Sequence, residues 1–300
     1  MSETDFMKSP ARRFAADFAA DRIALGALAV FCLVLFAALL APVISPQDPY
    51  NLAQLDILDS KLAPGARGME GITYWLGTDE QGRDMLSAML YGLRISLGVG
   101  TISTLVGLLI GTSIGLVAGY TGGWVDSVIM RIVDIQLSFP SILIALVLLA
   151  LVGQGVDKIV IALILVQWAY YARTVRSAAL VEKRKEYVDA AVCLGFSTGR
   201  IVFRHLMPNC LPPLTVVATM QIAHAIALEA TLSFLGLGMP ITSPSLGLLI
   251  ANGFIHLLSG KYWISFFPGI ALVVTIVSIN LVGDHLRDVL NPRLAGWRSA

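Results

Sequence analysis

Residues 186–209 read EYVDAAVCLGFSTGRIVFRHLMPN, a polar, glycine-interrupted stretch with basic residues toward its end. The chain on both sides of it is strongly apolar: 56% of the 300 residues are hydrophobic and only 14% are charged. A soluble domain averages about 25% charged residues, so this chain has too little charge to cover a water-exposed surface of its size. The composition therefore predicts a polytopic membrane protein. The net charge of +1 gives no indication of nucleic-acid binding.

Within this stretch, the pattern predicts two short helices joined at a glycine. The first covers 186–194, and Gly195 ends it, as glycines at helix C-caps do. Ser197 or Thr198 can cap the second helix, and Pro208, Pro212 and Pro213 end the unit. Such a knob, with one apolar and one charged face, is suited to docking into a groove on another protein; the alternative is a solvated loop that only connects two spans. The predicted apolar face consists of Val188, Ala191 and Val192.

Six apolar segments are long enough to cross a bilayer as helices, which takes about 20 residues each, so the predicted fold is all-α. The first is a retained transmembrane helix rather than a signal peptide, because its 22 uncharged residues exceed a signal core of about 7–15. A shorter run, 246–258, is interrupted by glycines and predicts an interfacial or re-entrant helix. The six segments are 23–44, 96–120, 131–152, 157–177, 212–235 and 262–283.

The orientation in the membrane follows from the positions of Lys and Arg, which are enriched in cytoplasmic segments. With the N-terminus inside, the cytoplasmic parts hold 15 of the 21 basic residues. We therefore expect both termini in the cytoplasm. The predicted organisation is an N-terminal tail at 1–22, the first span at 23–44, an external loop at 45–95, a transmembrane core at 96–284 with the knob in the cytoplasmic loop 179–209, and a C-terminal tail at 285–300.

Two patterns inside the spans predict contacts. Small residues recur every four positions in the second span and form a smooth stripe, which lets a neighbouring helix approach closely. The neighbour is either a helix of this chain or a partner subunit. At the start of the third span, Arg131 and Asp134 are three residues apart and are expected to pair along one helix face. The stripe consists of Ser103, Gly107, Gly111, Gly115 and Gly119.

The polar stretch resembles the cytoplasmic EAA loop of ABC-importer permeases, whose pattern is roughly E-A-A-x3-G-x9-I-x-L-P. The matching residues are Asp189–Ala191, Gly195 and Met207–Pro208. In that family the loop is the coupling helix that fits a cleft on the ATPase subunit. Aspartate has a shorter side chain than glutamate, so a salt bridge to the partner would need a closer approach. The departures from the pattern are Asp189 for Glu, His205 for Ile and Met207 for Leu.

Further stretches narrow the resemblance to one family, the dipeptide/oligopeptide/nickel permeases, and within it to the second or "C" permease component. They occur in the right order and extend the similarity over nearly all of the chain. The stretches are LGTDEQGRD at 76–84, YGLRISL at 91–97, DIQLSFP at 134–140, EATLSFLGLG at 229–238, NLVGD at 280–284, LRD at 286–288 and NPRL at 291–294.

The resemblance implies a type I ABC-importer permease fold with about six transmembrane helices, in the bacterial inner membrane. Such a permease forms half of a pathway with a homologous second permease, above two ATPase subunits and below a periplasmic binding protein. The chain has no G-x-x-x-x-G-K-[ST] phosphate loop. We therefore expect no enzyme activity, metal or cofactor in this chain, with ATP and Mg²⁺ bound by the partners.

The implied substrates are di- and oligopeptides, with nickel complexes, glutathione or another peptide-like solute as alternatives within the family. A gradient-driven secondary transporter is the alternative from a different class; it should show broken helices around an ion site and, often, inverted repeats.

The resemblance also assigns roles to residues. Asp189 is the leading candidate for a polar contact to the ATPase, Gly195 supplies the bend, and the apolar face points toward the groove. In the fifth span, His224 and Glu229 are ionisable groups at membrane depth, which are costly and often functional. They are expected to line the pathway or to pair with a partner chain, unless Glu229 reaches the outer interface. The implied coupling residues are Glu186, Val188, Asp189, Ala190, Ala191, Val192, Gly195 and Pro208.

Overall fold

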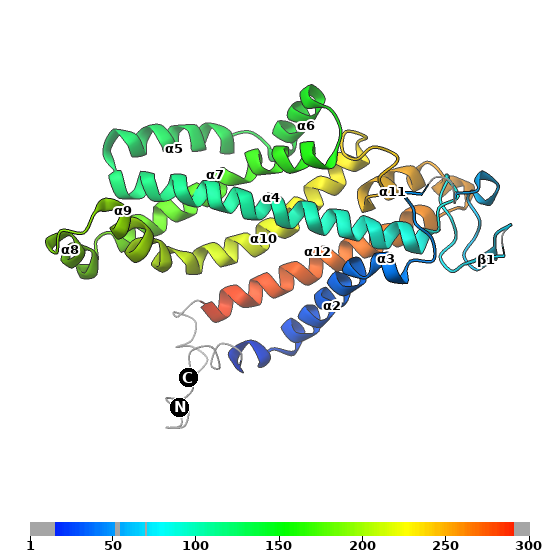
Figure 1. Cartoon of the computed structure of the whole chain (residues 1–300), viewed down its shortest axis with the longest axis horizontal. Helices are drawn as coiled ribbons and strands as arrows, with labels where there is room; N and C mark the ends of the chain where they lie inside the picture. Colours follow the sequence, from blue (N-terminus) through cyan, green and yellow to red (C-terminus); the bar gives the residue numbers. More distant parts are fainter. Residues whose placement is uncertain (1–15, 52–54, 70, 291–300) are drawn as a thin grey trace.

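The computed structural model of the chain describes residues 16–51, 55–69 and 71–290. Most of the predicted N-terminal tail and the NPRL stretch at 291–294 lie outside these ranges. The described part is an elongated bundle of long helices, with the knob helix α8 (Glu186–Cys193) at one end. A small hairpin of β1 (Ala66–Arg67) and β2 (Thr73–Tyr74) lies at the opposite end (Figure 1).

The remaining elements connect these two ends. Among the residues that the structure describes, five helical segments are long and apolar enough to cross a membrane, namely α2, α4, α7, the continuous run 198–234 and α12. The bounds are α2 (Arg22–Leu39), α3 (Ala41–Ile44), η3 (Ile57–Asp59), α4 (Met85–Thr121), α5 (Gly123–Leu137), α6 (Ser141–Val152), α7 (Val156–Glu182), α9 (Thr198–Arg200), η4 (Ile201–Leu206), α10 (Met207–Phe234), α11 (Leu246–Phe254), η5 (Leu257–Ser259) and α12 (Trp263–Leu290).

The predicted third span, 131–152, is wrong as a single helix. Helix α5 ends at Leu137, α6 begins at Ser141, and the two axes are bent by 87°. Pro140 causes the break, because proline has no N–H to donate and disfavours helical backbone in the residue before it. Together the two helices are apolar enough for one broken span, which would bring the total to the predicted six.

The predicted pairing of Arg131 with Asp134 is also wrong, because α5 is tied to α7 instead. Arg173 on α7 forms an ion pair with Asp134. One turn further along α7, Arg176 donates two hydrogen bonds of 2.6 Å to the carboxylate of Asp126. Ion pairs between helices therefore take the place of the expected pair within one helix.

The small-residue stripe of α4 lies against α7 of the same chain. A Cβ atom built on Gly111 would lie 2.6 Å from the Tyr171 Cβ, and one on Gly119 would lie 2.8 Å from the Ala179 Cβ. Only glycine leaves room for this approach, in which close packing supplies the attraction between helices. Ser103, at the start of the stripe, is buried and donates its hydroxyl to the Val99 carbonyl at 2.7 Å.

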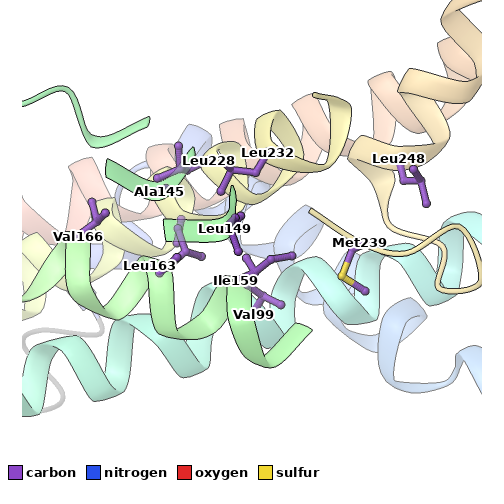
Figure 2. Close-up of a cluster of buried hydrophobic side chains, with 12 residues drawn as sticks. Val99, Ala145, Leu149, Ile159, Leu163, Val166, Leu228, Leu232, Met239 and Leu248 are labelled. Carbon is purple, nitrogen blue, oxygen red and sulfur yellow. The ribbon is translucent and has the colours of Figure 1, made fainter. Parts of the chain in front are cut away.

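The main apolar core lies where α4, α6, α7 and α10 meet, toward the hairpin end. Figure 2 shows Val99, Leu149, Leu163 and Leu228 pointing into it from these four helices. The short helix α11, which falls in the 246–258 run, packs onto α10 and α12. Gly247 allows this close contact, since a Cβ there would lie 2.6 Å from the Ala230 Cα. At nine residues, α11 is too short to span a bilayer.

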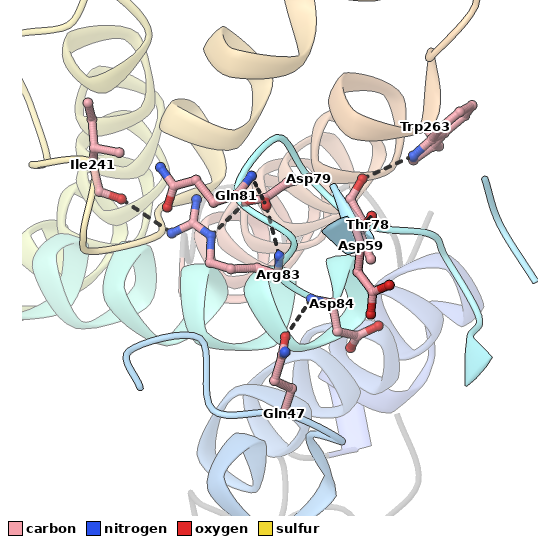
Figure 3. A network of polar contacts seen from close by, with 9 residues as sticks. All are labelled: Gln47, Asp59, Thr78, Asp79, Gln81, Arg83, Asp84, Ile241 and Trp263. Atoms are coloured by element: carbon pink, nitrogen blue, oxygen red, sulfur yellow. Dashed lines mark hydrogen bonds and ion pairs between the residues drawn. The ribbon is translucent and has the colours of Figure 1, made fainter. Parts of the chain in front are cut away.

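Buried polar contacts brace the loop before α4. Asp79 and Arg83 are almost fully buried, and the Arg83 Nε donates to the Asp79 Oδ2 at 2.6 Å. The Arg83 Nη1 also donates to the Ile241 carbonyl at 3.3 Å, and the Trp263 Nε1 donates to the Thr78 carbonyl at 3.2 Å (Figure 3). The loop is therefore fixed to the segment after α10 and to the start of α12.

Candidate functional site

The knob is held to the bundle by its own apolar residues. In α8, Val188 and Ala191 are one helical turn apart and share a face. Both pack into a cluster with Ile201 and Leu206 of η4, and this cluster continues into the bundle as far as Leu116 on α4. The two residues are only 2% and 4% exposed. The knob is thus anchored in a hydrophobic core that reaches α4, α7 and α10.

The prediction that Val188 and Ala191 face a partner is therefore wrong. Both side chains are covered by this chain, because the residues after the bend fold back over them. Of the predicted face only Val192 points outward, and this residue is 55% exposed. Leu194, at 71%, and Phe203, at 57%, are the other large apolar side chains that the knob leaves exposed.

The bend at Gly195 follows a standard helix C-terminus. Its φ of 72° is in the left-handed region, which glycine enters without strain. The Gly195 N–H donates to the Val192 carbonyl at 2.9 Å, and the Phe196 N–H donates to the Ala191 carbonyl at 3.2 Å. These bonds form the Schellman arrangement. The chain then turns back, so that the second half of the knob covers the first.

The prediction that Pro208, Pro212 and Pro213 end the unit is wrong, because all three lie inside a continuous helical run that extends from Thr198 to Phe234. The wider π turn of η4 ends at Leu206, just before Pro208. The Met207 N–H donates to the Val202 carbonyl, five residues earlier. The wider π turn relieves the clash between the proline ring and the preceding helical turn, so the helix continues past Pro208. The knob is therefore a direct extension of α10.

Hydrogen bonds also join the base of the knob to the neighbouring helices. The Tyr187 hydroxyl donates to the Glu182 Oε2 at 2.9 Å and accepts from the Asn209 Nδ2 at 3.3 Å. Burial, together with the Glu182 carboxylate, raises the pKa of Tyr187 to about 12, so its proton stays available for this contact. Lys183 donates to the Tyr120 carbonyl near the end of α4. The start of α8 is thus connected to α4, α7 and α10.

Two carboxylates of α8 point away from the bundle. Glu186 and Asp189 are exposed in the first turn of the helix, and within the described ranges neither makes an ion pair. Ala190 is exposed beside them. The outer surface of the knob therefore combines free negative charge with the exposed side chains of Val192 and Leu194, a combination that can enter a mostly apolar groove with a basic rim.

The two ionisable residues of the fifth span are not brought together. His224 is on an exposed face of α10, whereas the Glu229 side chain is fully buried. The Glu229 carboxylate accepts a hydrogen bond from the Ser96 Oγ at 2.7 Å and one from the Ser233 Oγ at 2.8 Å. Glu229 therefore joins α10 to α4 within this chain and does not reach the surface. Neither serine was predicted from the sequence, although Ser233 follows Glu229 by one helical turn.

Comparisons with known proteins identify the family of the chain. The family model described as binding-protein-dependent transport system inner membrane component matches residues 111–296. The model of the N-terminal TM domain of oligopeptide transport permease C matches residues 9–64. Both confirm the resemblance inferred from the motifs.

Characterised relatives match over almost the full chain. The di/tripeptide transport system permease protein DppC of Pseudomonas aeruginosa is 38% identical over 95% of this chain and 93% of that protein. The dipeptide transport system permease protein DppC of Bacillus subtilis is 35% identical over 97% of this chain and 90% of that protein. The glutathione transport system permease protein GsiD of Pectobacterium atrosepticum is 36% identical over 96% of this chain and 93% of that protein.

The fold also matches a solved structure. A chain of the MetNI methionine ABC transporter, in an inward-facing conformation, superposes with a TM-score of 0.56 at 21% identity, covering 69% of this chain and 98% of that chain. This likeness confirms the predicted ABC-importer permease fold. The chain belongs to the family of inner-membrane components of binding-protein-dependent transport systems.

Proposed function

We propose that this chain is the C-type permease subunit of an ATP-driven importer of di- and oligopeptides in the bacterial inner membrane. It forms half of the pathway with a homologous second permease. Two ATPase subunits bind ATP and Mg²⁺ on the cytoplasmic side, and a periplasmic binding protein delivers the substrate. The peptide substrate is supported by the names of the relatives, most of which are peptide permeases.

One observation carries the coupling role: the knob has an exposed tip and a base that is continuous with a membrane-length helix. Val192 and Leu194 are free to enter an ATPase groove, and Asp189 is placed to meet a basic residue at its rim. Because α10 extends directly from the knob, and the base of the knob also packs against α4 and α7, a displacement of the tip is transmitted to these three helices. In this way ATP-driven closure of the ATPases biases the permease between its inward-open and outward-open states.

The coupling role is tested by reversing the charge at the tip. Asp189→Lys places a cation where the proposal needs an anion, so we expect about a tenfold loss of substrate-stimulated ATP hydrolysis, equivalent to about 1.4 kcal/mol. Asp157→Lys is the matched control, because Asp157 is exposed at the start of α7, far from the knob. The complex is purified with its co-purifying subunits and assayed in proteoliposomes. Wild-type ATPase docking and hydrolysis in Asp189→Lys would show that this carboxylate does not couple.

The substrate and the energy source are tested by uptake in a host that lacks its own peptide importers. Labelled dipeptide, tripeptide, glutathione and nickel are supplied separately, with the cognate binding protein and ATPases co-expressed. We expect peptide uptake that survives an uncoupler while ATP is maintained. Uptake of glutathione alone or of nickel alone would identify that solute, in place of peptides, as the substrate. Uptake that collapses with the ion gradient at constant ATP would support a secondary transporter.

A further inference from the structure

A narrow groove lies between the first part of α4 and the start of α7, at the hairpin end of the bundle. Its volume is about 270 Å³. Tyr50, Tyr91 and Arg94 lie at its polar end, while Gly98 and Val156 line its apolar part. The groove is remote from the knob, and its residues take no part in the proposed coupling.

Hydrogen-bond donors that lack a matching acceptor lie at the polar end of the groove. The rings of Tyr50 and Tyr91 meet edge to face, with their centroids 5.4 Å apart. Arg94 is exposed and, among the residues that the structure describes, makes neither an ion pair nor a hydrogen bond. Asp48 is the carboxylate near Tyr50, and it accepts the Tyr50 backbone N–H at 3.0 Å rather than pairing with Arg94. A guanidinium beside two phenols is suited to binding an oxyanion, especially a phosphate.

The apolar part of the groove continues along one face of α4. A Cβ built on Gly98 would have no atom within 4 Å, so the groove is open over this glycine. Ile102, Leu105 and Leu109 follow on the same helix face, and each is more than half exposed. From Arg94 to Leu109 the helix rises by about 22 Å. This length exceeds half of a hydrocarbon core of about 30 Å, so the track is long enough for one acyl chain.

We propose that this groove binds one anionic phospholipid, with its phosphate on Arg94 and the two tyrosine hydroxyls, and with an acyl chain over Gly98 and along α4. Arg94 lies just before the predicted span 96–120, where a headgroup meets the hydrocarbon, and tyrosines are enriched at that depth. A helix of a second protein could cover the apolar track, but it would leave the guanidinium without an anion. In the orientation predicted from the charge bias, the lipid belongs to the outer leaflet.

The test uses the full chain with its co-purifying subunits, reconstituted in vesicles that contain phosphatidylglycerol with a photoreactive diazirine in one acyl chain. After irradiation, the labelled residues are mapped by mass spectrometry. We expect the label to concentrate on residues 95–109 and 156–160. Arg94→Gln should lower it about tenfold, as for the loss of a charge-assisted hydrogen bond. Gly98→Leu should displace it by filling the groove, whereas the control Gly26→Leu, on an open face of α2, should leave it unchanged.

Four results would overturn the proposal. They are equal labelling by a phosphatidylcholine probe, no effect of Arg94→Gln, displacement of the label by inorganic phosphate or a tripeptide, and protection of the groove by a co-purifying protein. The third result would assign the site to a soluble anion, and the fourth would assign it to a subunit interface. Size-exclusion profiles in detergent identify variants that have failed to fold, and Tyr91→Phe, which removes one hydroxyl and keeps the ring, then serves in place of any such variant.

Discussion

Gly111→Ala is expected to weaken the contact between α4 and α7, whereas Gly107→Ala is not. At Gly111 the new Cβ would lie 2.6 Å from the Tyr171 Cβ and 3.0 Å from the Ala172 N, so the α7 backbone must shift. At Gly107 the nearest atom, the Gln167 Cβ, is at an ordinary 3.5 Å. Overpacking costs about 1–3 kcal/mol, and the upper end applies where backbone must move.

Each alanine also gains about 1 kcal/mol of helix propensity over glycine. The expected net effects are a loss of about 2 kcal/mol for Gly111→Ala and a gain of up to about 1 kcal/mol for Gly107→Ala. The two variants carry the same chemical change on the same helix face, one turn apart, so each controls for the other. The free energy of unfolding is measured by titration with sodium dodecyl sulfate in mixed micelles, followed by tryptophan fluorescence. If Gly111→Ala proved as stable as Gly107→Ala, the assignment of the stripe to α7 would be wrong.

Substitutions at three further positions test buried or bridging polar groups. Arg83→Met leaves the buried Asp79 carboxylate unpaired and should destabilise the chain by about 3–5 kcal/mol, measured by the same titration. Glu229→Leu removes the acceptor of two buried hydroxyls and should cost about 1–3 kcal/mol, with Glu229→Gln recovering part of this loss. The folded-state pKa of Tyr187 is raised from 10.0 to about 12. Its contribution to stability is therefore complete below pH 10 and is lost as the pH rises through 12, so thermal unfolding of Tyr187→Phe should lack this alkaline decline.

Controls for these substitutions come from the chain itself. Arg67→Met removes an exposed cation from β1 and should change stability by no more than about 0.5 kcal/mol. An equal loss of stability in Arg67→Met and Arg83→Met would mean that burial does not determine how much the ion pair between Asp79 and Arg83 stabilises the chain. If the stability of Tyr187→Phe declined at alkaline pH as steeply as that of the wild type, the decline would belong to another titrating group. If Glu229→Leu kept full stability, the hydroxyls of Ser96 and Ser233 would have other acceptors.

The sequence predicted the membrane spans well where apolar length alone decides them, and less well at their ends. The apolar length predicts the second span at 96–120, but α4 begins at Met85. Hydropathy could not show this, because the first turns contain Ser87 and Arg94 and pack beside a polar loop. A local signal was nevertheless present: Asp84 caps the helix, and its carboxylate accepts the Ser87 N–H at 2.8 Å. A capping pattern outside the apolar run identifies a helix that extends beyond the hydrocarbon.

The knob shows why a helix face can be predicted more easily than its partner. The spacing of Val188 and Ala191 predicts that the two residues share a helix face, but it does not indicate which residues cover that face. The cover comes from Ile201 and Leu206, which reach it only because the backbone reverses at Gly195. A second apolar segment within the same chain is always at high effective concentration, so it covers the face before any other protein can. A docking surface should therefore be sought among the apolar residues that remain exposed after the chain has folded back on itself.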